Sequence, residues 1–198
     1  MSGEVVIVPT GTANLASVAA ALRRLGARAV VSDDPDAITN ASHVVLPGVG
    51  TFGAAMARLR QSGADRALRR RIERGRPLLA ICVGHQLLFR ESAESPQVAG
   101  LGVIDAPVER FPESVRTPQF GWNKISASAH GRLVESGWAY FANSYRATEA
   151  PGLRVATADH GGPFIAAVEG DGLLGCQFHP ELSGPYGARL LRRFLELC

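Results

Sequence analysis

The chain of 198 residues contains 21 lysine and arginine residues against 18 aspartate and glutamate residues, which gives a formal net charge of +3. Hydrophobic residues make up 46% and charged residues 20% of the sequence, a balance that excludes a disordered chain and is typical of a globular one. No apolar run approaches the roughly 20 residues that cross a bilayer, and the first residues lack the basic start of a secretory signal, so we expect a cytoplasmic protein.

The first half of the sequence alternates between short apolar runs and amphipathic segments. Strands are predicted over residues 4–9, 28–31, 43–47 and 77–81, and helices over residues 15–25, 52–60 and 65–74. Strands that alternate with helices form a mainly parallel sheet covered on both faces. Ligands of such sheets bind at the carboxyl ends of the strands, which here are residues 47–50 and 82–84.

Arginine is concentrated in and just after the third predicted helix. The arginines are Arg66, Arg69, Arg70, Arg71, Arg74 and Arg76. Asp65 and Glu73 are interspersed with them, and no aromatic residue is present there to stack on nucleic-acid bases. The pattern favours a solvated helix face over a nucleic-acid-binding surface.

The second half of the sequence has shorter apolar runs separated by glycine and proline. Strands are predicted over residues 102–110, 138–141, 153–158, 164–169 and 173–178, and a final helix over residues 187–197. No repeat, low-complexity tract or linker divides the chain. We therefore predict a single α/β domain over residues 1–198, with a central, mainly parallel mixed sheet, helices on both faces and extra antiparallel strands.

The segment AICVGHQLLF (residues 80–89) places a cysteine where a predicted strand ends, and we expect residues 87–89 to be the packed face of a following helix. A helix N-terminus favours the thiolate form of Cys82, and Gly84 removes side-chain bulk where a substrate must approach. A buried packing cysteine explains this segment equally well. The cysteines, Cys82, Cys176 and Cys198, are too few and too far apart for a disulfide framework.

A nucleophilic cysteine needs a base, and His179 is the best placed of the five histidines. It ends a predicted strand and precedes Pro180, which favours extended geometry. In an extended chain, residues i and i+2 face the same side, so Glu181 is able to orient the imidazole and complete a triad. The alternative is a solvated His-Pro-Glu turn. His85 is closer in sequence to the thiol, but a proton on it would oppose the dipole of the helix that begins there.

Two segments, residues 80–89 and GCQFHPE (residues 175–181), resemble the class I, or triad, glutamine amidotransferases. Within that family, LPGVGTFG (46–53), PQFGWN (118–123) and YFANSY (140–145) resemble the glutamine amidotransferase subunits of imidazole glycerol phosphate synthase, from histidine biosynthesis. The resemblance extends from about residue 5 to the C-terminal helix. It implies a flavodoxin-like fold, with no cofactor and no metal.

The resemblance implies a catalytic role for each residue of the triad. Cys82 is expected to attack the side-chain amide of glutamine and to form a γ-glutamyl thioester. His179 is expected to act first as base and then as acid, while Glu181 orients it. The intact triad argues against a subunit that has lost catalysis.

The resemblance also implies contacts with the oxyanion and with the substrate. Backbone N–H groups are expected to hold the oxyanion, at Val49, Gly50 and Val83. Glutamine is expected to contact Gln86, Asn143, Ser144 and Tyr145. In this family the strand that matches residues 47–50 is thought to reorient for activity.

The family further implies a heterodimer with a (β/α)8-barrel cyclase subunit. That subunit receives ammonia through a tunnel and converts a phosphorylated ribonucleotide into imidazole glycerol phosphate and AICAR. Asn14, Trp122 and Asn123 match residues at or near the subunit interface. Alternatively, Trp122 is a core residue and Asn14 a helix N-cap.

The sequence departs from the family pattern at several places. Leu182 replaces a usual lysine, His85 replaces a methionine typical of this branch, and Pro9-Thr10 replaces Asp-Tyr. Two further departures are Ala13, where glycine is common, and Asn143, which replaces a frequent histidine. None of these belongs to the triad, so they concern coupling to the partner more than the chemistry. Two alternatives stay open: a glutaminase subunit of another synthase, such as the anthranilate or aminodeoxychorismate type, and a stand-alone Cys-His hydrolase of similar fold.

Overall fold

The computed structural model describes residues 4–11 and 14–197. Its first half contains β1 (Glu4–Ile7), α1 (Leu15–Arg24), β2 (Arg28–Val31), α2 (Pro35–Asn40), β3 (His43–Gly48), α3 (Phe52–Ser62), α4 (Ala64–Glu73), β4 (Leu78–Cys82), α5 (Val83–Gln86) and β5 (Phe89–Ser92). Its second half contains β6 (Ile104–Arg110), β7 (Gln119–Ala127), β8 (Gly137–Asn143), β9 (Tyr145–Arg146), β10 (Arg154–Asp159), β11 (Pro163–Glu169), β12 (Leu173–Cys176), the 3-10 helix η1 (Pro180–Leu182) and α6 (Gly184–Leu195).

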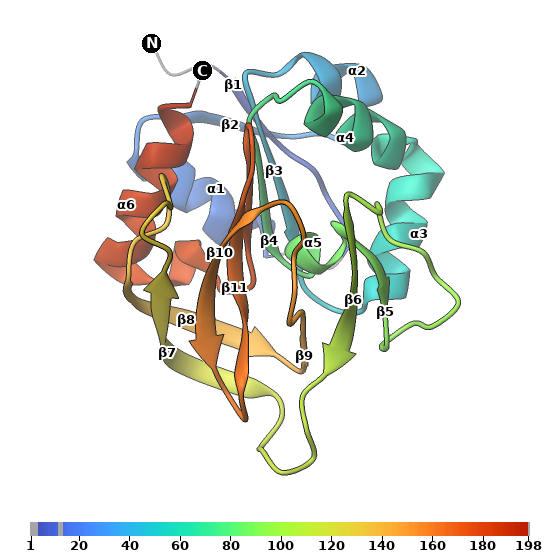
Figure 1. The fold of residues 1–198 in the computed structure, drawn as a ribbon. Coiled ribbons are helices and arrows are strands. Elements are labelled where there is room, and N and C mark those ends of the chain that lie inside the picture. The colour runs from blue at the N-terminus through green and yellow to red at the C-terminus, as the bar shows by residue number, and fades with distance from the viewer. Residues whose placement is uncertain (1–3, 12–13, 198) are drawn as a thin grey trace.

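A nine-stranded mixed sheet runs through the molecule in the order β2-β1-β3-β4-β12-β11-β10-β7-β8 (Figure 1). Strands β2, β1, β3, β4 and β12 are parallel to one another. The sheet continues from β11 to β8 in antiparallel pairs. Helices α1 and α6 lie on one side of the parallel strands, and α2, α3 and α4 lie on the other. The predicted α/β fold with a parallel core and antiparallel additions is confirmed.

The strands at the centre of the parallel core are buried along their whole length. Every residue of β3, β4 and β12 is buried. Helices cover both faces of the sheet here, which explains why these strands are continuous apolar runs and not alternating ones. Their carboxyl ends therefore lie side by side on a rigid base.

The chain after α5 differs from the prediction. Leu87 and Phe89 are buried as expected, but they do not belong to a helix, because α5 ends at Gln86 and β5 begins at Phe89. The backbone instead pairs with the segment before β6: Leu101 donates to the carbonyl of Leu87 at 2.7 Å, and Val103 donates to that of Leu88 at 2.9 Å. The carbonyls of Leu87 and Leu88 thus accept hydrogen bonds from this segment and not from a further helical turn, and α5 ends after four residues.

The sequence patterns also miss α2, β7 and β9 and displace the final helix. Helix α2 has a single buried residue, Ile38, so it carries no apolar period. Strand β7 is nine residues long but buries only Gln119 and Ile125, which leaves no continuous apolar run. The final helix starts at Gly184, three residues before the predicted position.

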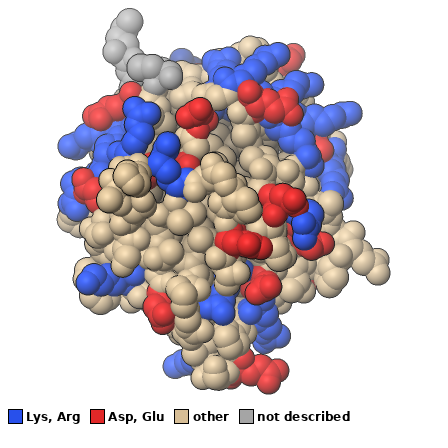
Figure 2. All heavy atoms as spheres, in the orientation of Figure 1, with Lys and Arg blue, Asp and Glu red and all other residues tan. Residues whose placement is uncertain are grey.

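The arginine-rich segment is not solvated throughout, so the prediction is wrong at Arg71. This side chain is fully buried in the structure. Its guanidinium donates to the carbonyls of Pro77, Ile38, Ala41 and Ser42 at 2.8 to 3.0 Å. It therefore ties α4 to the chain ends beside β3 and β4. Basic and acidic residues are interspersed elsewhere on α4, and blue and red side chains are mixed at the upper right of Figure 2.

Two of the three cysteines lie within the described residues, and both are free and buried: Cys82 and Cys176. Cys198 lies outside those residues. Over the ranges that the structure covers, no helix is both long enough and apolar enough to span a bilayer.

Candidate active site

A sharp turn at Cys82 joins the centre of the sheet to α5. Cys82 is the last residue of β4 and has φ 53° and ψ −110°. It is the only non-glycine residue with positive φ among residues 4–11 and 14–197. Such a conformation costs about 1–3 kcal/mol and persists only where the surrounding structure enforces it. This geometry is that of a nucleophile at a strand-to-helix elbow.

Close backbone contacts hold this turn against the end of β3. A Cβ atom on Gly84 would lie 1.9 Å from the carbonyl oxygen of Leu46, so only glycine fits. Gly48 is opposite Cys82 in the β3–β4 register. The hydroxyl of Thr10 donates to the carbonyl of Pro47 at 3.0 Å, which anchors the same strand end. The segment over residues 47–50 is thereby fixed next to the thiol.

The structure brings Cys82, His179 and Glu181 together. Strand β12 pairs in parallel with β4, Cys176 opposite Ile81, so the chain beyond β12 passes Cys82. The side chain of His179 is close enough to Cys82 for that group to raise the pKa of the imidazole, and its Nδ1 lies 2.8 Å from Oε1 of Glu181. Both side chains of this pair are almost completely buried, which excludes a solvated turn. The order Cys82, His179, Glu181 is the one expected of a nucleophile, a base and an orienting acid.

The environment of His179 favours its protonated form. Burial lowers the pKa of the imidazole, but the hydrogen bonds to Cys82 and Glu181 and the charges of both groups raise it to about 10. An imidazolium between a sulfur and a carboxylate is the arrangement that activates a cysteine nucleophile.

The backbone of His179 is fixed to β8. Its N–H donates to the carbonyl of Tyr140 at 2.9 Å. The hydroxyl of Ser183 donates to the carbonyl of His179 at 2.6 Å and accepts from the N–H of Tyr140 at 3.0 Å. The base therefore has little freedom to leave the thiol.

A cavity of about 130 Å³ adjoins the thiol. Its lining residues are Gly50, Cys82, Val83, Gln86, Glu94, Ala142, Asn143, Ser144 and Tyr145. The structure thus gathers seven residues expected at the active site, although Val49 does not line this cavity. The volume is well below the roughly 300–1,000 Å³ of drug-sized pockets and suits a small ligand.

The cavity walls are joined by hydrogen bonds between side chains and backbone. Nε2 of Gln86 donates to the carbonyl of Tyr145 at 3.2 Å and to Oε1 of Gln177 at 2.9 Å. Nδ2 of Asn143 also donates to the carbonyl of Tyr145, at 2.9 Å. Oδ1 of Asn143 is buried without a partner, which leaves an acceptor for a ligand.

The sequence patterns miss Glu94 and Gln177 at this site. Glu94 lines the cavity and accepts from the N–H of Phe52 at 2.6 Å. It lies in a polar turn whose sequence gives no signal. Gln177 directly follows β12 and lies two residues before His179, and that spacing was a usable signal.

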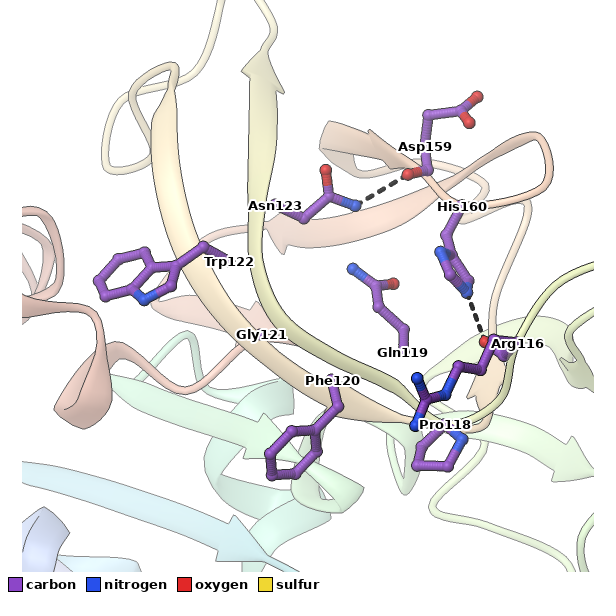
Figure 3. Close-up of a pocket in the computed structure, with 9 residues that line it drawn as sticks. All are labelled: Arg116, Pro118, Gln119, Phe120, Gly121, Trp122, Asn123, Asp159 and His160. Carbon is purple, nitrogen blue, oxygen red and sulfur yellow. Dashed lines mark hydrogen bonds between the residues drawn. The ribbon is translucent and has the colours of Figure 1, made fainter.

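Two of the three residues expected at a partner interface line one cavity, and the third caps a helix. Trp122 is 55% exposed, and it lines a cavity of about 590 Å³ with Asn123 (Figure 3). Nδ2 of Asn123 donates to the carbonyl of Asp159 at 2.8 Å. Asn14 instead caps α1, because its side chain accepts from the N–H of Ser17 at 3.3 Å. Trp122 is thus not a core residue, and Asn14 has a structural role.

His85 lies at the elbow but has no contact with the thiol. It is fully buried, its ring packs edge-on against Phe89 with centroids 5.2 Å apart, and neither ring nitrogen has a hydrogen-bond partner. Burial lowers its pKa to about 3. A histidine that stays neutral in an apolar site is not the base for Cys82.

Burial of neutral His85 makes stability pH-dependent. Its folded-state pKa of about 3 lies below the ordinary 6.5, so its contribution is complete above about pH 6.5 and is lost as pH falls toward 3. Between pH 6.5 and 5 we expect the free energy of unfolding to fall by about 2 kcal/mol from this group. His85→Met should remove that part of the slope in urea unfolding measured at several pH values. An equal slope in the variant and the wild type would contradict this.

The family assignment agrees with this geometry. The family described as glutamine amidotransferase class-I matches residues 6–198. The chain belongs to this family and is an enzyme of the class I glutamine amidotransferase type.

Relatives of nearly equal length are named more specifically than the family, as subunits of one synthase. Imidazole glycerol phosphate synthase subunit HisH of Methanothermobacter thermautotrophicus is 41% identical over 98% of both chains. The subunit of the same name from Escherichia coli is 42% identical and covers 98% of this chain and 100% of its own. A crystal structure of a glutamine amidotransferase superposes with a TM-score of 0.78 at 27% identity and covers 97% of both chains.

Proposed function

We propose that this chain is the glutaminase subunit of imidazole glycerol phosphate synthase, acting in histidine biosynthesis in the cytoplasm. The observation that carries the proposal is the buried contact of Cys82 with the His179–Glu181 pair beside a small polar cavity. Relatives that carry the name of this synthase match nearly the whole chain. We take residues 1–198 to act as one domain.

The first half of the reaction forms a thioester and releases ammonia. The thiolate of Cys82 attacks the side-chain carbonyl carbon of glutamine, and the negative charge moves to the carbonyl oxygen. His179, as imidazolium, gives its proton to the amide nitrogen as the C–N bond breaks. Ammonia leaves, and a γ-glutamyl thioester remains on Cys82.

The second half regenerates the enzyme. Neutral His179 takes a proton from water, whose oxygen attacks the thioester carbon. The C–S bond then breaks, and glutamate leaves as the thiolate re-forms beside the imidazolium. Glu181 keeps its hydrogen bond to Nδ1 throughout, so the other ring nitrogen faces the reacting atoms.

Backbone N–H groups and the cavity walls account for binding. The N–H of Val83 belongs to the first turn of α5, where no helical acceptor is available. With the N–H groups of Val49 and Gly50, it provides the oxyanion contacts that we propose. The carboxylate of Glu94 and the free acceptor of Asn143 suit the ammonium group of glutamine, while Gln86, Ser144 and Tyr145 complete the wall.

An aromatic face on β7 and β8 is the surface that we propose for the cyclase subunit, a (β/α)8 barrel that forms a heterodimer with this chain. The face consists of Phe120, Trp122, Trp138 and Tyr140, which project from one side of the two paired strands. Phe120, Trp122 and Trp138 are 74%, 55% and 58% exposed. Exposed aromatic clusters of this kind mark protein interfaces.

The aromatic face is also close to the chemistry. Strand β8 continues into Asn143, which lines the catalytic cavity, and the carbonyl of Tyr140 accepts from His179. A partner on this face is placed to receive ammonia, which would otherwise become protonated in neutral water. Nearby Leu182 is 42% exposed and offers an apolar contact where relatives of this branch have lysine. We also propose that Asn14 and Asn123 contact the cyclase subunit at the border of the aromatic face.

The function is tested by measuring glutamate release from glutamine by the isolated chain, and then with the cyclase subunit and its nucleotide ligand. We expect low activity alone and a large rise in the complex. Trp122→Ala should weaken the stimulation, because interface tryptophans often contribute 2 kcal/mol or more. Val31→Ala, at an exposed position on β2, serves as control.

Two outcomes would contradict the proposal. High turnover without any partner would indicate a stand-alone hydrolase. Stimulation only by a chorismate-using subunit would indicate a synthase of the anthranilate or aminodeoxychorismate type.

A further inference from the structure

Gln177 is a fully buried side chain in contact with the nucleophile. It follows β12 directly, and the β12–β4 register carries it alongside Cys82. Its Nε2 donates to Sγ of Cys82 at 3.8 Å. Its Oε1 accepts from Nε2 of Gln86 at 2.9 Å. The amide of Gln177 thus joins the reactive sulfur to the wall of the substrate cavity.

The strength of this hydrogen bond depends on whether the Cys82 thiol is protonated. In the protonated state the thiol donates to the carbonyl of Ala142 at 3.9 Å. A thiolate has no hydrogen to donate, so it loses the hydrogen bond to Ala142, and its charge lies next to that carbonyl oxygen. In the contact with Gln177 the sulfur is the acceptor and not the donor. This hydrogen bond becomes stronger when the thiol ionises, since hydrogen bonds to charged acceptors are about twice as strong as neutral ones. Gln177 therefore favours the ionised nucleophile.

The other end of the amide fixes the substrate wall. Gln86 is held between Oε1 of Gln177 and the carbonyl of Tyr145 at 3.2 Å. Without Gln177, the donor of Gln86 keeps only the Tyr145 carbonyl and gains rotational freedom. One side chain thus sets both the charge of the nucleophile and the position of the cavity wall.

We propose that Gln177 is a further catalytic residue, which stabilises the Cys82 thiolate through Nε2 and orients Gln86 through Oε1. The inference rests on the proposed glutaminase function for its kinetic consequences, but not for the thiol contact. Two variants separate the two ends of the amide. Gln177→Met keeps similar volume and removes both bonds, whereas Gln177→Glu keeps an acceptor for Gln86 and removes the N–H donor.

The thiol contact is tested by alkylation of the isolated chain with iodoacetamide as a function of pH, which requires no glutamine. In Gln177→Met we expect the rate at pH 7 to fall about tenfold and the rate-versus-pH curve to move to higher pH. In Gln177→Glu the shift should be larger, because a carboxylate repels the thiolate. Gln61→Met, on the exposed surface of α3, is the control for the substitution. Thermal unfolding shows that each variant is folded.

The substrate wall is tested by glutamate release in the complex with the cyclase subunit. We expect kcat to fall in both variants, and KM for glutamine to rise in Gln177→Met while it stays within about twofold in Gln177→Glu. Alkylation curves of both variants that coincide with the wild type would overturn the inference. If the wild-type complex releases no glutamate, the proposed function fails, and the alkylation curves still decide the role of Gln177.

Discussion

Replacing Cys82 with alanine is expected to abolish glutamate release, because its thiol lines the cavity and is the nucleophile of the proposed mechanism. Removal of a triad nucleophile lowers turnover by a factor of about 10⁶ in a comparable hydrolase. The measurement is glutamate production from glutamine by the complex with the cyclase subunit. The same complex should still form imidazole glycerol phosphate when ammonium salts replace glutamine.

The matched control is the same substitution in the other described cysteine. Cys176 is fully buried in β12, and burial raises the pKa of its thiol well above the ordinary range, so it stays protonated. Cys176→Ala should lower stability by about 1 kcal/mol through a small cavity and retain glutamate release. Glutamate release that survives in Cys82→Ala but not in Cys176→Ala would reverse the assignment of the nucleophile.

Replacing Glu181 with glutamine is expected to lower kcat by about 10³- to 10⁴-fold with little change in folding. The variant keeps the shape of the side chain, but it removes a charge 2.8 Å from Nδ1. The hydrogen bond and the charge of Glu181 both help to raise the pKa of His179 to about 10. The pKa of His179 should therefore fall, and the imidazolium should be lost at lower pH.

This expectation is measured by the pH dependence of glutamate release, together with NMR titration of His179. Glu73→Gln, on the exposed face of α4, provides a charge-matched control that should behave as the wild type. A Glu181→Gln variant with wild-type kcat would show that the buried carboxylate supports the loop and not the base.

The parallel core, and the passage of the chain after β12 beside Cys82, could be predicted from the sequence because each follows from a local rule. Continuous apolar runs identify β3, β4 and β12 as doubly covered strands. The carboxyl ends of parallel strands meet at one edge, which brings the chain after β12 to Cys82. These arguments need no knowledge of distant contacts. The extended geometry expected at residues 179–181 is not observed, because Pro180–Leu182 form η1, and Glu181 reaches Nδ1 of His179 from that 3-10 helix.

What the sequence did not predict depends on contacts between distant segments. The chain leaves the helix after Gln86 because Leu87 and Leu88 pair with residues 101–104. Arg71 is buried because four backbone carbonyls from other segments surround it. Glu94 reaches the cavity from a turn that has no periodicity. None of these partners can be recognised from the residue itself.

The position of β12 determines when the enzyme can first be active during synthesis. This strand is the last of the chain, yet it lies between β4 and β11 in the middle of the sheet. A nascent chain that lacks residues 173–181 therefore exposes the edges of two buried strands, which are prone to pair with other chains. It also lacks the base. If His179 and Glu181 act as we propose, hydrolysis of glutamine cannot begin until the ribosome has passed Glu181, and premature termination yields an aggregation-prone fragment that releases no ammonia.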